Sequence, residues 1–188
     1  MGIDLSPNMV QEYNTRVGQS TTALEISASV GNFLDPTDSP PEGLQGEEFH
    51  NFDLAAVGLG FHHFEDPVLA ATRLTARLKE RGCLLIIDFI LNEKSGEGGE
   101  GEGDTKWNEI GHLHCHGFGK HHGCGNGDAA VAQTKKRLGF GEEEMREIFR
   151  SAGVGKDFGF EIIAKGAMFQ TTKCSMIQDV FMARGTKA

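Results

Sequence analysis

The chain has 188 residues, of which 38% are hydrophobic and 24% charged, a composition typical of one globular domain. The formal net charge is −9, and the sequence has no basic stripe that could neutralise phosphates. Both features argue against nucleic acid as a partner. No apolar run approaches the roughly 20 residues of a membrane-spanning helix, so we expect no membrane partner. Four irregularly spaced cysteines favour reduced thiols and a cytoplasmic location.

The first predicted elements are a strand end and a helix. The strand closes with Asp4 at its tip, and Ser6 is then a good N-cap residue. Pro7 suits the first helical position, where its missing N–H costs nothing. The helix is expected to end at Gly18, and its apolar face holds Met9, Val10, Tyr13 and Val17.

The middle of the chain predicts a strand–helix–strand unit. A first strand over Leu24–Val30 ends at Gly31, and a second covers Phe52–Gly58. Asp66 and Pro67 open a helix whose buried side is expected to hold Val68, Ala71, Leu74 and Leu78. The apolar run Cys83–Asp88 is typical of a parallel strand covered on both faces. This order predicts an α/β layered sheet that is mostly parallel.

The pattern breaks over residues 95–128. Glycine alternates with acidic residues at first, and a His/Cys-rich stretch follows, so we expect an insertion outside the core of a single 1–188 domain. Regular structure resumes with a helix from Glu142 to Gly153. The strand segments predicted after it are 158–163, Met168–Gln170 and Asp179–Arg184, the last two joined by a loop.

Four of these segments, in this order, resemble class I S-adenosylmethionine-dependent methyltransferases. Residues 52–64 resemble the fourth-strand region of that family, and residues 82–88 look like its fifth strand. Residues 2–9 are similar to its second strand and the following helix, and residues 140–153 to the helix before its last two strands. The resemblance implies a Rossmann-like fold, S-adenosylmethionine as cofactor and methyl transfer to a small-molecule substrate.

The resemblance also assigns cofactor contacts. Asp4 matches the acidic residue that holds the ribose hydroxyls, and Leu5 follows it. Asn32 stands where the family usually has an aspartate that accepts from the adenine amino group, and an amide oxygen can still accept. Phe33 could flank the adenine ring, and Gly58 matches the strand end beneath the methionine part.

The family's first, central strand and its glycine-rich turn have no counterpart in this sequence. Their loss would leave unpaired backbone groups on two neighbouring strands. We therefore expect a truncated chain whose independent activity is doubtful. The alternative is a non-catalytic, methyltransferase-like interaction protein with a protein partner at the open sheet edge.

His62 and His63, just beyond the 52–58 strand, are the candidate catalytic residues. A base is needed only if the methyl acceptor must lose a proton. The competing interpretation makes the two histidines a turn element packed by Phe61 and Phe64.

A second alternative is a metal-binding protein. Several histidines and two cysteines fall within residues 112–124, a density that suits zinc. The spacing lacks a Cys-x-x-Cys pair and the many glycines would have to be ordered, so no metal ligand is assigned.

Overall fold

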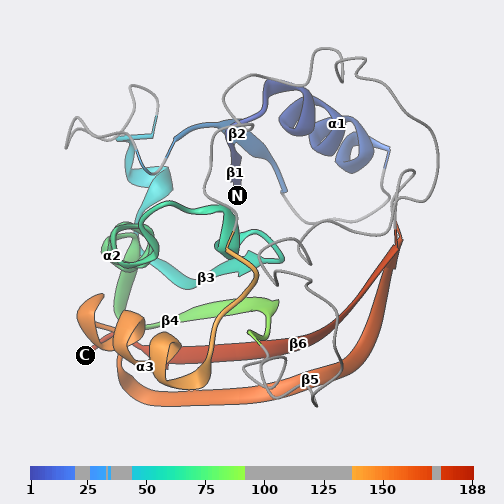
Figure 1. The fold of residues 1–188 in the computed structure, drawn as a ribbon. Helices are drawn as coiled ribbons and strands as arrows, with labels where there is room; N and C mark the ends of the chain where they lie inside the picture. Colours follow the sequence, from blue (N-terminus) through green and yellow to red (C-terminus); the bar gives the residue numbers. More distant parts are fainter. Residues whose placement is uncertain (20–25, 33, 35–43, 92–136, 171–174) are drawn as a thin grey trace, which may run out of the picture.

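The structure is a computed structural model that describes residues 1–19, 26–32, 34, 44–91, 137–170 and 175–188 (Figure 1). The expected 95–128 insertion and Phe33 lie outside these residues. In chain order the helices and strands are β1 (Gly2–Asp4), α1 (Pro7–Gly18), β2 (Ala28–Val30), β3 (Phe52–Gly58), α2 (Pro67–Ala76), β4 (Leu78–Phe89), α3 (Glu142–Ser151), β5 (Lys156–Gln170) and β6 (Ser175–Thr186). Short 3₁₀ turns cover Glu47–Phe49 and Phe61–His63.

The larger sheet has four strands in the order β3-β4-β6-β5. β3 pairs in parallel with β4, from Leu54 opposite Cys83 to Gly58 opposite Ile87. β4 then pairs antiparallel with β6, and β6 with β5. The predicted strand–helix–strand unit is therefore confirmed, and β3 has the predicted bounds. The connection through α2 allows the parallel pairing, because parallel neighbours need a crossover.

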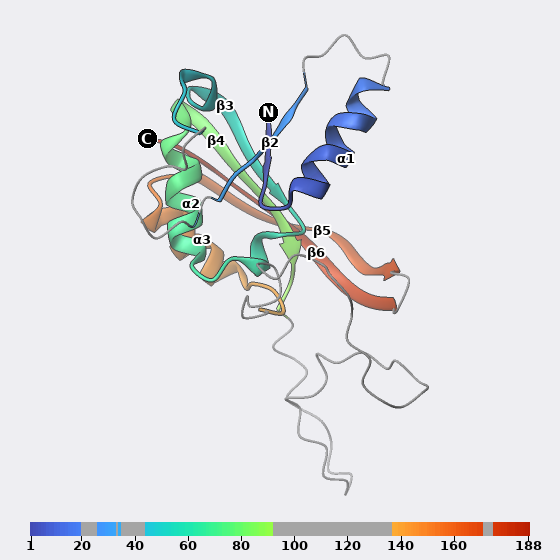
Figure 2. The same ribbon diagram turned by 90° about the horizontal axis from the view of Figure 1, so that it is seen from above.

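A second, smaller sheet holds β1 and β2, paired in parallel with Ile3 opposite Ser29. α1 follows β1 and contacts both strands. Its start is as predicted, since the Ser6 side chain accepts a hydrogen bond from the Met9 amide. Figure 2 shows α1 on one side of the strands and the α2–α3 pair on the other, which is the layering expected for a Rossmann-like α/β protein.

β1 and β3 each have one pairing partner among the residues that the structure describes, and no ladder joins the two sheets there. Because the smaller sheet has two strands among the described residues, it buries only part of the apolar face of α1. Val10 is buried, but Met9 is 59% exposed and Tyr13 is 43% exposed, although both were predicted on the same apolar face. A two-stranded sheet is narrower than the apolar stripe of the helix, so part of the stripe stays uncovered.

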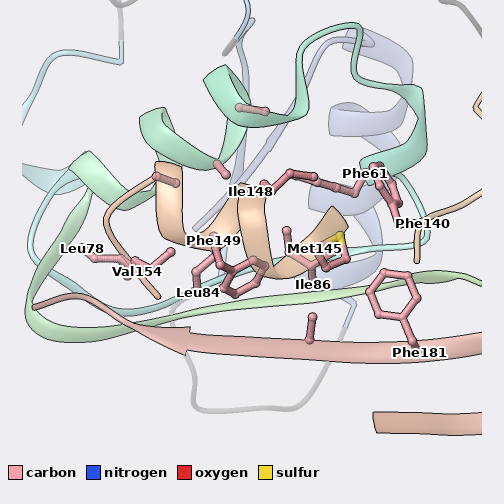
Figure 3. Packing of buried hydrophobic residues seen from close by; sticks show 14 residues of the cluster. Phe61, Leu78, Leu84, Ile86, Phe140, Met145, Ile148, Phe149, Val154 and Phe181 are labelled. Carbon is pink, nitrogen blue, oxygen red and sulfur yellow. The ribbon is translucent and has the colours of Figure 1, made fainter. Parts of the chain in front are cut away.

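The hydrophobic core lies between the larger sheet and the helices α2 and α3 (Figure 3). Alternate residues of β4 face it, with Leu84 and Ile86 fully buried. α3 contributes Met145, Ile148 and Phe149 from one face, as its periodicity predicts. The other large, fully buried members are Phe61, Phe140, Val154 and Phe181.

Three predicted boundaries are wrong. β2 begins at Ala28, so residues 26 and 27 of the expected Leu24–Val30 strand lie outside it. α2 ends at Ala76, so Leu78 opens β4 instead of closing the helix. The chain then bends at Arg81 (φ 65°) and Gly82, where an added Cβ would lie 2.9 Å from the Lys79 carbonyl oxygen. β5 also runs unbroken to Gln170, so Met168–Gln170 belongs to the same strand as residues 158–163. Within the described residues, no helix is long and apolar enough to cross a membrane.

Candidate functional site

The ends of β1 and β2 bring two of the predicted residues to one edge of the smaller sheet. Asp4 is the last residue of β1, and its carbonyl oxygen accepts from the Gly31 amide at 3.0 Å, just before Asn32. Because the two strands are parallel, Asp4 and Asn32 lie at the same end of the pair. Asp4 is exposed, and so is Leu5, at 47%.

Both polar side chains at this edge also bind the local backbone. Asp4 Oδ1 accepts from the Ser6 amide at 2.8 Å, which fixes the carboxylate at the start of α1. Asn32 Oδ1 accepts from the Leu34 amide at 2.9 Å. Each oxygen has a second lone pair, and the carboxylate has a second oxygen, so neither group is used up by these bonds. An exposed, oriented carboxylate of this kind can accept hydrogen bonds from a pair of hydroxyl groups.

Leu44 joins the edge of the smaller sheet to the rest of the molecule. Gly31 makes room for it, because an added Cβ would lie 2.3 Å from Leu44 Cδ1. The carbonyl oxygen of Leu44 accepts from Arg77 Nη1 at 2.7 Å, and that of Phe49 from the same nitrogen at 3.2 Å. Arg77 is buried, and the loss of hydration lowers its pKa from the usual value.

The end of β3 leads directly into the two predicted histidines. Gly58 closes the strand, and the Leu59 amide then donates to the Ile87 carbonyl oxygen at 2.8 Å. The next turn is anchored by Phe61, which is fully buried against Phe140 and Phe64 at ring-centroid distances of 5.4 and 5.5 Å. The surface beside Gly58 is open, since an added Cβ would meet no described atom within 4 Å.

His62 is bound to a buried carboxylate at the end of β4. Its Nδ1 lies 2.7 Å from Asp88 Oδ1, and its backbone amide donates to Asp88 Oδ2 at 2.9 Å. The Asp88 side chain is fully buried, and that of His62 is 11% exposed. His63 is exposed, and its ring is tilted by 39° to the ring of His62, with the two centroids 4.1 Å apart. Phe61 and Phe64 pack the turn, as the turn interpretation expects, and Asp88 orients His62, while the catalytic role of the two histidines stays a prediction.

The structure places the predicted residues in two groups. Asp4, Leu5 and Asn32 lie at the end of the β1–β2 pair, and Gly58, His62 and His63 lie at the end of β3. Figure 2 shows β1 and β3 running in the same direction, so both groups lie toward one side of the molecule. Asp88 was missed by sequence reasoning, although a single acid at the end of an apolar strand is a signal that could have found it.

Metal binding gains no support from the described part of the chain. No group of three or more His, Cys, Asp or Glu side chains there could hold an ion. The His/Cys-rich stretch of residues 112–124 lies outside the described residues, so the metal alternative remains a prediction.

No protein-family model matches the chain, and no curated protein matches it by sequence. Solved structures do resemble it. A S-adenosylmethionine-dependent methyltransferase from Thermotoga maritima, described as a possible histamine N-methyltransferase, has a TM-score of 0.58 and 16% identity over 100% of this chain and 73% of that one. A phosphoethanolamine N-methyltransferase from Haemonchus contortus, solved with S-adenosyl-L-methionine, has a TM-score of 0.54 and 15% identity.

That second match covers 99% of this chain but 42% of the Haemonchus protein. A third similar chain, with a TM-score of 0.53 and 17% identity, comes from the complex between a Haloferax volcanii methyltransferase activator, Trm112, and a methyltransferase. This third match covers 98% of the present chain and 70% of the similar chain. At these identities the likeness shows a shared fold, and the Rossmann-like prediction is confirmed.

Proposed function

Starting from the S-adenosylmethionine-dependent methyltransferase fold that the chain has, we propose that it binds S-adenosylmethionine and takes part in methyl transfer to a small-molecule acceptor. The observation that carries this proposal is that the candidate cofactor-binding residues lie at the carboxyl ends of parallel strands. Asp4, Asn32 and Gly58 each lie at or just past the carboxyl end of a parallel strand. Ligands of open α/β sheets bind at such ends. The cysteine usage is consistent with a cytoplasmic site of action.

The donor set at the β1–β2 edge fits the nucleoside part of the cofactor. Asp4 would accept from the ribose hydroxyls with the lone pairs that the Ser6 amide leaves available. Asn32 would accept from the adenine amino group through its amide oxygen, and the exposed Leu5 side chain would lie against the ring. Phe33 is proposed as the other flank of the ring. Gly58, whose surface is open, would lie beneath the methionine part.

When bound, the cofactor supplies a methyl group on a positively charged sulfonium, which an in-line nucleophile can displace. The chain's own residues then have two tasks, to position the acceptor and to exclude water from the reacting atoms. His62 and His63 are the proposed residues at the reacting end, because they follow β3 directly and His62 is already oriented by Asp88.

We expect weaker cofactor binding than a sheet with a strand between β1 and β3 would give. The two groups of contacts lie on separate sheets among the described residues, so binding must also fix their relative position. Ordering of this kind reduces affinity.

Asp4→Ala should weaken binding of S-adenosylmethionine by about 5- to 150-fold. The reason is that two buried ribose hydroxyls would lose their acceptor, at a cost of about 1–3 kcal/mol. Equilibrium dialysis with radiolabelled S-adenosylmethionine measures the change. The matched control is Asp53→Ala, which removes an exposed carboxylate at the opposite end of β3 and should leave the affinity unchanged. Equal affinities of the wild type and Asp4→Ala would refute the assignment.

A second candidate is a non-catalytic chain that binds a protein partner through a sheet edge. The observation in its favour is that β3 is hydrogen-bonded along one edge only within the described residues, while Leu54 on this strand is 52% exposed. Such an edge is a template for strand addition. The Haloferax structure, a complex of an activator and a methyltransferase, gives a precedent for a partner on this fold.

A further inference from the structure

The buried Asp88 carboxylate has three contacts within hydrogen-bond distance. Oδ2 accepts from the His62 amide at 2.9 Å, and Oδ1 accepts from the Phe89 amide at 2.8 Å. Oδ1 also lies 2.7 Å from His62 Nδ1. Asp88 is fully buried, so this carboxylate is a fixed acceptor for both the backbone and the side chain of one histidine.

This arrangement determines which ring nitrogen of His62 carries the proton. An ionised carboxylate only accepts, so the contact at Nδ1 requires an N–H there. The neutral ring then has its lone pair on Nε2. The rings of His63 and Phe89, centred 4.1 and 5.1 Å from that of His62, restrict its rotation. The tautomer is thus assigned from the hydrogen-bond network.

We infer that Asp88 is a positioning residue that holds His62 with Nε2 as a proton acceptor, and that the methyl acceptor is therefore a hydroxyl or other nucleophile that must lose a proton. The inference rests on the proposed function and adds its substrate class. An acceptor that is already deprotonated, such as a thiolate, would need no base.

The proposed step balances as follows. The acceptor oxygen attacks the methyl carbon, and a C–O bond forms as the C–S bond breaks with its electron pair going to sulfur. His62 Nε2 takes the hydroxyl proton, and the resulting imidazolium is stabilised by the Asp88 carboxylate. The proton then passes to solvent, because 11% of the His62 side-chain surface is exposed.

The first test reads the tautomer directly, in the full chain labelled with ¹⁵N at histidine and held at pH 8. His62 is assigned by loss of its signals in His62→Gln, with His50→Gln as the control for a histidine elsewhere. We expect a protonated Nδ1 and an unprotonated Nε2, and a shift away from this tautomer in Asp88→Asn. A proton on Nε2 in the wild type would overturn the inference, whether or not the chain transfers methyl groups.

The second test measures transfer from S-adenosylmethionine to a panel of small alcohols, phenols and thiols. With phenol, which is protonated at pH 8, His62→Ala should lower kcat by about 10²- to 10⁴-fold. With thiophenol, which is ionised at that pH, kcat should hardly change. Transfer to thiols alone would overturn the acceptor class. If the chain binds S-adenosylmethionine but transfers methyl groups to none of the alcohols, phenols or thiols, that result would contradict the acceptor class as well.

A double variant separates positioning from a purely structural role. Asp88→Asn should lower kcat with little change in KM, and should have almost no further effect in the His62→Ala background, because the two residues act as a unit. A structural role would lower activity equally in both backgrounds, and that result would overturn the inference. If S-adenosylmethionine does not bind at all, the proposed function fails, while the tautomer test still decides the role of Asp88.

Discussion

Replacing Phe149 with alanine should lower the free energy of unfolding by about 3–5 kcal/mol. Phe149 is fully buried on the face of α3 that covers the sheet (Figure 3). Its ring meets that of Phe158 edge-to-face at a centroid distance of 5.3 Å. Truncation removes this contact and leaves a cavity that close-packed neighbours fill only in part. Urea unfolding followed by circular dichroism measures the loss.

Met168→Ala is the control for the Phe149 variant. Met168 is on β5 but 69% exposed, so its truncation should change the free energy of unfolding by no more than about 0.5 kcal/mol. If Phe149→Ala lowered the free energy of unfolding no more than Met168→Ala does, Phe149 would not be packed in the core between α3 and the larger sheet.

Gly185→Ala should destabilise the fold by about 1–3 kcal/mol or more, although it adds a single methyl group. The added Cβ would lie 2.1 Å from the Val154 carbonyl oxygen and 2.7 Å from Phe149 Cδ1. Because the first of these atoms is backbone, rotation of a side chain cannot relieve the overlap. β6 would have to move away from the segment after α3, which loosens its pairing with Leu84 on β4.

Gly18→Ala provides the matched comparison for Gly185→Ala. Gly18 is the last residue of α1, and a Cβ there would meet no described atom within 4 Å. Alanine in a helix should therefore be neutral or stabilising by up to about 1 kcal/mol. Both variants are compared with the wild type by urea unfolding. Equal stability of the two variants would contradict the close approach of β6 to Val154.

Sequence patterns predicted the elements whose apolar residues have one clear period. β3, the start of α1 and the buried face of α3 followed this rule, because strand alternation, capping and helical spacing are local signals. The end of α2 did not, since Leu78 continues the helical spacing but is recruited by pairing with Phe52 across the sheet. That competition is tertiary, and no local pattern encodes it.

The long hairpin of β5 and β6 was also under-predicted. Gly166 lies between the two predicted pieces of β5, residues 158–163 and Met168–Gln170, and interrupts the apolar pattern there. The structure keeps one strand through register shifts opposite β6, and the Gly166 amide is satisfied by Asp179 Oδ1 at 2.7 Å. Bulges of this kind depend on the partner strand, so they are not visible in one segment alone.

For the candidate site, the sequence predicted where the residues lie in the fold better than which side chains they contact. Asp4 and Asn32 were predicted from the family resemblance and His62 from its place after the 52–58 strand, and the structure places all three at or just past strand ends. The link between His62 and Asp88 joins residues 26 apart in the chain, across the β3–β4 crossover. Only the parallel register brings them together, so the pair could not be deduced before the sheet was known.

Amide hydrogen exchange of the full chain, with and without saturating S-adenosylhomocysteine, tests the central claim most directly. The claim is that one ligand spans the ends of β1, β2 and β3. We predict slower exchange at residues 2–6, 31–32 and 58–63, and no change in the β5–β6 hairpin. Protection confined to other segments, or none at saturating ligand, would contradict the claim. Protection along the whole of β3 on adding a partner protein, without any ligand effect, would favour the interaction protein instead.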